Sequence, residues 1–257
     1  MSRRLDWAEH PASAYDEIDP MRTVAILPTA AVEQHGPHLP LGVDAYIMEG
    51  MLARLRMACP DDLDLRILPV QAVGKSNEHL WAKGTLTLSA ETALRVWTEI
   101  GLSVARAGLR KLVIVNSHGG NADLISILAR EMRVQAGMLA VKTSWFDHGV
   151  PDDLYSEHER RFGIHGGDAE TSLMLAFRPD LVEMGKAAIF RSAAEGAPIP
   201  PIGPTARAWI ASDLNPAGVV GDASLATAGK GEATAAHQVQ GMLALLRAVA
   251  EAAPPAS

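Results

Sequence analysis

The sequence contains very little cysteine: Cys59 is the single one among 257 residues. One thiol cannot form a disulfide within the chain, which fits a reducing compartment. The chain also lacks any apolar run of the roughly 18 to 20 residues that a membrane helix requires. Its N-terminal segment carries Arg3 and Arg4 where a signal peptide needs an apolar core. We therefore expect a cytoplasmic protein with no membrane partner.

The sequence also lacks an excess of positive charge. It has 23 Lys and Arg residues against 30 Asp and Glu residues, which gives a formal net charge of −7. Nucleic-acid-binding domains are typically basic, so this balance argues against nucleic acid as the partner. With 48% apolar and 21% charged residues, the composition is that of a folded globular protein rather than a disordered one.

Short apolar segments alternate with segments of helical periodicity. The segments that read as strands are nearly continuously apolar, as strands buried on both faces are. They are residues 23–28, 66–71, 112–116 and 138–144. This alternation predicts a mostly parallel sheet with helices on both faces, within one domain that spans residues 1–257.

Between the predicted strands, Ser89 and Asn121 are the expected N-caps of two helices. Further along the chain, the stretch 197–216 contains five prolines. We expect it to form a long loop over a site or a subunit contact.

Several polar residues follow the first predicted strand in the sequence. Glu33 and His35 are two residues apart, so in an extended segment both side chains leave the same face. Asp44 follows at the expected start of a helix, where the helix dipole favours a carboxylate. Taken singly, these residues could be a surface charge, a loop histidine and an N-cap. Together, at the strand end where open α/β sheets bind ligands, they favour a metal site.

Two further polar blocks follow the same pattern. The third predicted strand leads into His118 and a pair of glycines, which allow a metal or substrate to approach the backbone. Another glycine-rich loop carries His165, and Glu170 lies about one turn inside the helix that follows. A free imidazole has a pKa suited to proton transfer, so His165 is a candidate proton shuttle. The alternatives are a glycine-rich turn with an incidental histidine and a helix with a surface glutamate.

Taken together, these blocks resemble the creatininase family, that is, creatinine amidohydrolase and its relatives. The matching pieces occur in family order and cover about residues 25–232. They are residues 33–40 with Asp44, 74–79 with 84–85, 118–121, His165 with 170–172, and 218–224. The resemblance implies a three-layer α/β/α fold, often assembled as a homohexamer, and a two-metal site that hydrolyses amide C–N bonds.

The resemblance also implies roles for the candidate residues. One metal ion would be held by Glu33, Asp44 and His118, and the other by His35, Asp44 and Glu170. His165 corresponds to the catalytic histidine of the family. With only nitrogen and oxygen ligands, the ions would be zinc, manganese or iron(II), one or two per chain. They would activate a water that attacks the amide, and His165 would protonate the leaving nitrogen.

The sequence departs from creatininase itself at several positions. That enzyme has a metal-binding glutamate two residues after the first-metal histidine, whereas this chain has Gly120. Water, substrate or another side chain must then take the ligand's place, or that metal position binds weakly. Lys83 stands where a proline is usual before Gly-Thr. Trp145 is a candidate for a tryptophan that covers the substrate, although its spacing from His118 is not that of the family. Creatinine is therefore not the expected substrate.

We accordingly predict a metal-dependent amidohydrolase that cleaves a C–N bond of a small substrate, with cyclic amides and formamides as candidate classes. Two alternatives stay open: a metallopeptidase that trims a specific short peptide, as one branch of the family does, and a non-catalytic metal-binding protein. Other polar residues have ordinary interpretations. The run 157–161 is expected to be a solvated face, and Asp147 and His148 are expected to be loop residues outside the site.

Overall fold

The computed structural model describes residues 3–256; Met1, Ser2 and Ser257 lie outside the described residues. Its centre is a four-stranded sheet in the order β2-β1-β3-β4, in which all neighbouring strands are parallel. The strands are β1 (Val24–Thr29), β2 (Leu65–Ile67), β3 (Lys111–Asn116) and β4 (Leu139–Ser144). They correspond to the apolar runs of the sequence, and β1 and β3 are buried along their whole length.

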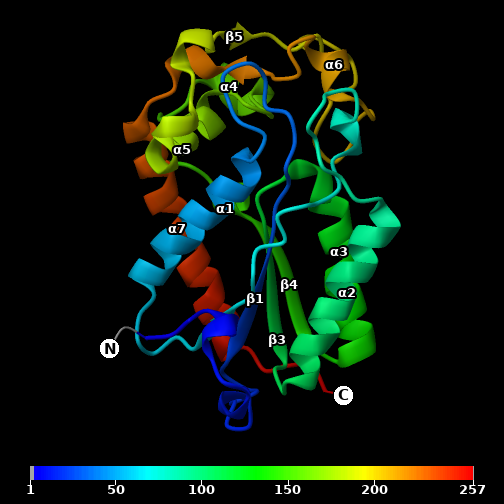
Figure 1. The fold of residues 1–257 in the computed structure, drawn as a ribbon, viewed down its shortest axis with the longest axis vertical. Coiled ribbons are helices and arrows are strands. Elements are labelled where there is room, and N and C mark those ends of the chain that lie inside the picture. The colour runs from blue at the N-terminus through cyan, green and yellow to red at the C-terminus, as the bar shows by residue number, and fades with distance from the viewer. Residues whose placement is uncertain (1–2, 257) are drawn as a thin grey trace.

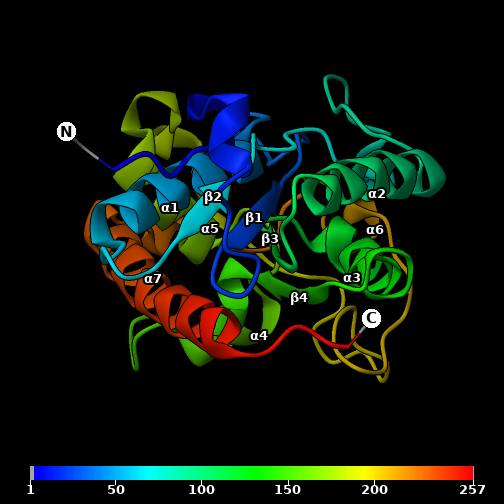
Figure 2. The same ribbon diagram turned by 90° about the horizontal axis from the view of Figure 1, so that it is seen from below.

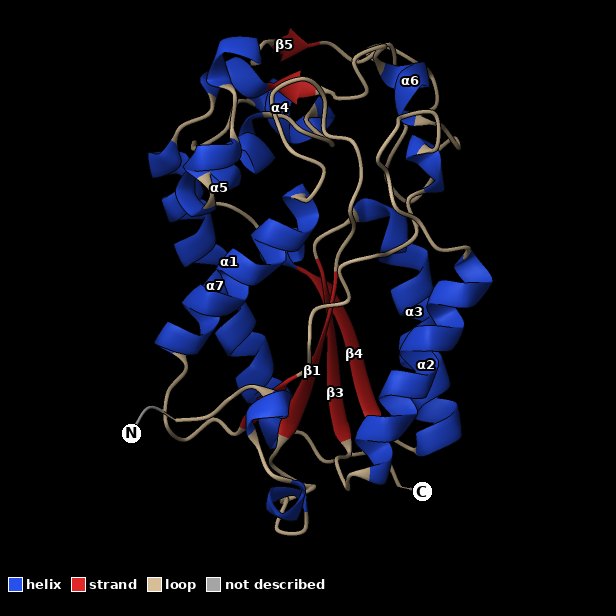
Figure 3. Ribbon diagram, in the orientation of Figure 1, coloured by secondary structure: helices blue, strands red, loops and turns tan. Residues whose placement is uncertain are grey.

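Helices cover both faces of this sheet (Figure 1, Figure 3). One layer contains α1 (Val43–Ala58), α5 (Asp168–Phe177) and α7 (Ala228–Glu251), and the other contains α2 (Ala90–Arg106) and α3 (Ala122–Ala136). Seen from below, the sheet lies between the two layers (Figure 2). The predicted three-layer α/β/α architecture with a mostly parallel sheet is confirmed.

Each layer forms its own apolar core against one face of the sheet. Side chains of a strand alternate between its faces. Within β1, Ile26 packs in the core of α1 and α7, and Leu27 packs in the core of α2 and α3. All the apolar residues of β1 are therefore buried, which explains why the strand shows no polar alternation.

The two predicted caps have different outcomes. Ser89 caps α2, because its side chain accepts a hydrogen bond from the backbone N–H of Thr92. Asn121 makes no capping hydrogen bond with its side chain. Its Oδ1 accepts from the N–H of Lys75 and its amide donates to the carbonyl of Ala30. Asn121 therefore stands at the predicted N-cap position of α3 but does not cap the helix with its side chain, which joins two loops instead.

The short elements lie together at the end of the molecule toward which the central strands run (Figure 1). They are α4 (Glu157–Phe162), β5 (Ile189–Phe190), α6 (Ala211–Leu214) and β6 (Gly221–Asp222). The β5 and β6 strands form a small antiparallel pair. The stretch 197–216 is a loop, as expected, apart from α6. Within residues 3–256, none of the helices combines the length and apolar character that crossing a bilayer requires.

The charged run 157–161 is solvent-exposed at Glu157, Arg160 and Arg161, as the sequence predicts, but the prediction is wrong for Glu159. Glu159 is 3% exposed, and its carboxylate accepts a hydrogen bond from the N–H of Asp222 at 2.8 Å. A Cβ on Gly163 or on Gly167 would collide with this carboxylate. The glycines therefore make room for a buried acid that joins α4 to β6.

Trp145 does not cover a substrate site, so that hypothesis is wrong. Its side chain is completely buried in the core between α1 and α7, and its Nε1 donates to Met48 Sδ at 3.3 Å. His148 lies on the same side of the sheet, 3.4 Å from Thr143 Oγ1 and close to Gly241 of α7. His148 is therefore outside the site, as expected.

The buried position of Trp145 predicts a large effect on stability. We expect Trp145→Ala to lower the free energy of unfolding by about 3–5 kcal/mol, because it leaves a cavity in the core. Urea unfolding measures this change. Trp81→Ala is the matched control, since Trp81 is 46% exposed and its loss should change stability by about 0.5 kcal/mol or less. Equal effects of the two substitutions would contradict the packing of Trp145.

Candidate metal centre

The loops that follow β1 and β3 bring the predicted ligands together. Glu33 and His35 lie after β1, Asp44 lies in the first turn of α1, and His118 lies directly after β3. Glu170 extends from the first turn of α5. Except for Glu170, each of these residues is at most 5% exposed. Five side chains from four segments thus meet at the carboxyl ends of parallel strands, where such sheets bind ligands.

Asp44 lies between two imidazoles. Its Oδ1 is 3.8 Å from His35 Nε2, and its Oδ2 is 3.6 Å from His118 Nδ1. His35 Nε2 is also 3.8 Å from Glu170 Oε2, and His118 Nε2 is 3.3 Å from Glu33 Oε2. Most of these separations are too long for hydrogen bonds. Two ligand atoms that each lie ~2.1 Å from one ion in a tetrahedral arrangement are ~3.4 Å apart. The observed separations between the side-chain atoms are close to this value.

Several buried polar atoms of the cluster have no hydrogen-bond partner. They are both carboxylate oxygens of Glu33, Oδ2 of Asp44 and Nε2 of His35. Each unpaired buried polar group costs about 1–3 kcal/mol, and more if it is charged, so folded proteins rarely leave one unpaired. Divalent cations would satisfy these atoms together. The set of carboxylates and imidazoles, without a thiolate, fits zinc, manganese or iron(II).

The electrostatics of the cluster also favour a bound cation. Burial raises the pKa of Glu33 and of Asp44 well above the usual range, and it raises the pKa of Glu170 to about 7. Burial lowers the pKa of His35 and of His118, so both imidazoles are neutral, which is the form that binds metal ions. A nearby positive charge would reverse the shifts of the carboxyl groups by stabilising the carboxylates.

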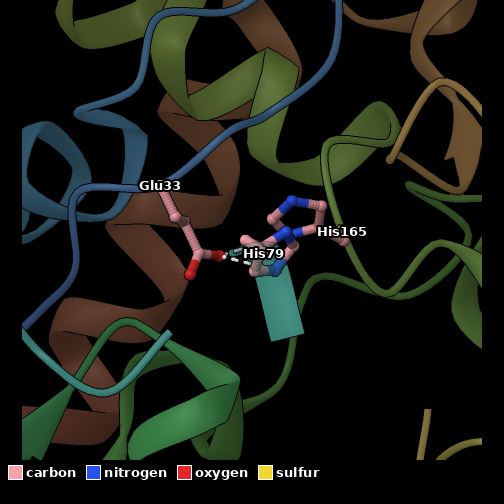
Figure 4. A group of neighbouring side chains, drawn as sticks. All are labelled: Glu33, His79 and His165. Carbon is pink, nitrogen blue, oxygen red and sulfur yellow. Dashed lines mark ion pairs between the residues drawn. The ribbon is translucent and has the colours of Figure 1, made fainter. Parts of the chain in front are cut away.

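Two further histidines border Glu33, and Figure 4 shows all three side chains pointing toward one another. His79 Nε2 is 3.2 Å and His165 Nδ1 is 3.6 Å from Glu33 Oε1. The Gln34 side-chain amide donates to His79 Nδ1, and His165 Nε2 donates to the Gln34 carbonyl, each at 2.8 Å. The second bond leaves Nδ1 of His165 unprotonated and facing the cluster. Burial lowers the pKa of His79 and of His165 to about 3.

Two residues of the cluster, Glu78 and His79, were not predicted from the spacing of polar residues in the sequence. His79 is 1% exposed, and Glu78 Oε1 is 3.7 Å from His118 Nε2. Both lie in the short 3-10 turn Asn77–His79, which follows no buried strand and contains no pair of glycines. Their only indication in the sequence was the family resemblance over residues 74–79, which implied no role for either residue.

A cavity of ≈ 580 Å³ opens onto the cluster. The loop 201–210 forms one wall and the candidate site residues form another, so the predicted loop lies over the candidate site. The wall of the loop is largely apolar, with Pro201, Ile202, Trp209 and Ile210, whereas the opposite side includes Glu33, Asp44, His118, His165 and Glu170.

Comparisons with known proteins identify relatives over most of the chain. The sequence model of the creatininase family, described as creatinine amidohydrolase, matches residues 8–246. The mycofactocin precursor peptide peptidase of Mycolicibacterium smegmatis is 28% identical over 227 residues, which cover 88% of this chain and 85% of the relative. The creatinine amidohydrolase of Pseudomonas putida is 31% identical over 198 residues, which cover 71% of this chain and 73% of the relative.

Solved structures of creatininase share the fold. A tryptophan-to-alanine variant has a TM-score of 0.78 at 24% identity and covers 97% of this chain and 100% of that chain. A structure described as manganese creatininase has a TM-score of 0.72 at 24% identity and covers 96% of this chain and 98% of that chain. A variant described as the Zn-Zn type has a TM-score of 0.73 at 25% identity, with the same coverage of 96% and 98%.

The unpaired buried atoms predict that metal ions stabilise the fold. Ligands that bind only the folded state stabilise it by about 2.7 kcal/mol at a concentration about 100 times Kd. We expect removal of metal with EDTA to lower the unfolding temperature, and addition of zinc or manganese to restore it. Differential scanning calorimetry measures both changes.

Substitution of Asp44 tests whether the stabilisation comes from this cluster. Asp44→Asn should strongly reduce the rise in unfolding temperature that zinc or manganese produces, because Asp44 faces both His35 and His118. Asp123→Asn is the matched control, since Asp123 is an exposed acid that lines the same cavity. A wild-type response to metal in the Asp44→Asn protein would contradict the assigned ligands.

Proposed function

The chain belongs to the creatininase family, and on that premise we propose that it is a metal-dependent hydrolase that cleaves an amide C–N bond of a small substrate. The observation that carries this proposal is the gathering of buried, unpartnered carboxylate and imidazole atoms around Asp44. The adjoining cavity of ≈ 580 Å³ supports a small substrate, because pockets for small molecules have volumes of about 300–1,000 Å³.

We assign one metal ion to Glu33, Asp44 and His118, and the other to His35, Asp44 and Glu170. Asp44 would contribute to both sets, because its two oxygens face different imidazoles. When bound, zinc, manganese or iron(II) ions would supply Lewis acidity and lower the pKa of water toward neutrality.

The chain's own hydrogen bonds orient the second set of ligands. His35 Nδ1 donates to the carbonyl of Glu33 at 3.0 Å, so its Nε2 is the free nitrogen that faces Asp44 and Glu170. The N–H of Gly166 donates to Glu170 Oε2 at 2.6 Å and holds this carboxylate toward His35. Outer hydrogen bonds of this kind fix the orientation of a ligand and raise its basicity.

His165 is the residue that we propose moves protons. Its Nε2 is held by the Gln34 carbonyl, and its free Nδ1 can take a proton from the attacking water. The Glu33 carboxylate, 3.6 Å away, would stabilise the resulting imidazolium. The same Nδ1 can then deliver the proton to the leaving nitrogen, which departs as a neutral amine. General acid–base catalysis of this kind contributes about 10²- to 10⁴-fold.

A peptidase that acts on a specific short peptide is the second candidate. It is favoured by the mycofactocin precursor peptide peptidase, whose match covers 88% of this chain against 71% for the creatinine amidohydrolase. Ile202 and Ile210, which are 45% and 44% exposed, line the cavity. They would suit the apolar side chains of a peptide.

The proposal also covers the domain organisation, the assembly and the cellular compartment of the protein. We propose that residues 1–257 form one hydrolase domain and that, as the family resemblance implies, the protein assembles as a homo-oligomer, specifically a homohexamer. The single Cys59 supports a reducing compartment, and hence the cytoplasm.

The proton-transfer role of His165 predicts the effect of its removal. His165→Ala should lower kcat by about 10²- to 10⁴-fold while the bound metal stays at the wild-type amount, because His165 is not an assigned ligand. Steady-state kinetics and elemental analysis measure the two quantities. His237→Ala is the control, since His237 is exposed and should leave both unchanged. Wild-type turnover in the His165→Ala protein would remove His165 from the mechanism.

The class of substrate can be tested with a panel of cyclic amides, formamides and short peptides. We expect hydrolysis of at least one non-peptide amide, detected by mass spectrometry, and loss of that activity with EDTA. Hydrolysis of peptides alone would favour the second candidate. A metal-loaded protein that hydrolyses none of them would favour a non-catalytic metal-binding protein and would contradict the proposal.

A further inference from the structure

The ion assigned to Glu33, Asp44 and His118 has three side-chain ligands from this chain. Residue 120, where the family resemblance implies a further metal-binding glutamate, is a glycine. We propose that Glu78 supplies the missing carboxylate to the ion assigned to Glu33, Asp44 and His118. This inference rests on the proposed metal centre and adds a ligand to it.

Glu78 occupies the space into which a side chain at position 120 would extend. A Cβ on Gly120 would lie 2.2 Å from Glu78 Oε1 and 2.5 Å from His118 Nε2. Real Cβ atoms do not approach neighbours so closely. A side chain on residue 120 and the present position of the Glu78 carboxylate therefore exclude each other. The glycine is what lets Glu78 approach His118.

The carboxylate of Glu78 lies within reach of two other candidate ligands. Its Oε1 is 3.7 Å from His118 Nε2, which in turn is 3.3 Å from Glu33 Oε2. One ligand atom from each of these three residues lies within 4.8 Å of the others. Both oxygens of Glu33 are buried without a hydrogen-bond partner, so this group contains unsatisfied atoms that point to a bound cation.

The turn that carries Glu78 is fastened to the loop that carries Gly120. Asn121, the residue after Gly120, accepts a hydrogen bond from the N–H of Lys75 through its Oδ1 at 3.0 Å. His118 Nε2 donates to the carbonyl of Lys75 at 3.0 Å, which leaves Nδ1, the nitrogen that faces Asp44, free for the ion, and Ser76 Oγ lies 3.3 Å from Nε2. The approach of Glu78 to His118 is therefore fixed by the surrounding backbone.

The two oxygens of Glu78 have different neighbours. Lys75 Nζ donates to Oε2 at 3.0 Å, which leaves Oε1 directed at His118. The side chain of Glu78 is 12% exposed and that of Lys75 is 26% exposed. The competing account is that Glu78 serves only to neutralise Lys75. The two accounts differ in what happens to metal binding when either partner is replaced.

Glu78→Gln tests the inference, because it preserves the shape of the side chain and removes its charge. We expect this variant to hold one metal ion fewer per chain than the wild-type protein, or to bind that ion more than about 100-fold more weakly. Loss of an outer hydrogen-bond partner costs about 10- to 100-fold, so a larger effect indicates a direct ligand. Elemental analysis and titration of zinc against a chromophoric chelator measure both quantities without a substrate.

Two matched variants separate the accounts. Lys75→Met removes a cation beside the site, so zinc binding should be unchanged or tighter if Glu78 is a ligand. Asp123→Asn removes an exposed carboxylate from the same cavity and should leave the number of bound ions unchanged. The unfolding temperature of each metal-free variant checks that it folds. If Glu78→Gln does not fold, the metal content and zinc affinity of Glu78→Ala are measured instead.

The possible results distinguish this inference from the proposed function. Wild-type metal content and zinc affinity in the Glu78 variant would overturn the inference and leave the metal centre in place. A wild-type protein that binds no metal ion would overturn the proposed metal centre itself. Loss of one ion from the Glu78 variant, with no loss from the two matched variants, supports the inference.

Discussion

The burial of Glu33 and Asp44 beside several imidazoles is the constraint on which the rest of the structure depends. Burying carboxylates is unfavourable unless hydrogen bonds or positive charge compensate for the lost hydration. Three of the four carboxylate oxygens of Glu33 and Asp44 have no hydrogen-bond partner, and burial raises the pKa of both carboxyl groups. The cost of burying these two carboxylates falls at the carboxyl ends of β1 and β3. Divalent cations would offset it, which is why we propose a metal centre rather than a polar core.

The geometry of the centre depends on side-chain amides that join loops from different strands. Gln34 contacts His79 and His165, and its amide also donates to the carbonyl of Gly218 at 2.6 Å. Asn121 connects the loop after β1 to the turn that carries Glu78. Because these loops leave buried parallel strands, the sheet fixes where they start and the amides fix where they meet. A hydrolase needs its groups held in this way, since small displacements of catalytic groups reduce rates strongly.

Much of the fold could be predicted from the sequence, because β1 and β3 are continuously apolar and polar residues follow each of them directly. The clustering of the predicted ligands follows from the same logic, although their role as ligands stays a prediction. What the sequence did not reveal depends on contacts between distant segments. Glu159 is buried against Asp222, which lies far along the chain and donates to its carboxylate, and Trp145 is buried by two helices. Glu78 approaches His118 only through the gap at Gly120.

Anomalous X-ray diffraction from crystals of the protein, purified without a metal-binding tag, tests the central claim most directly. Data collected at the zinc, manganese and iron absorption edges locate each ion and identify its element. We predict anomalous peaks on both sides of the Asp44 carboxylate, one next to His35 and one next to His118. Ordered side chains in this cluster with no peak among them, or with peaks only elsewhere in the molecule, would contradict it.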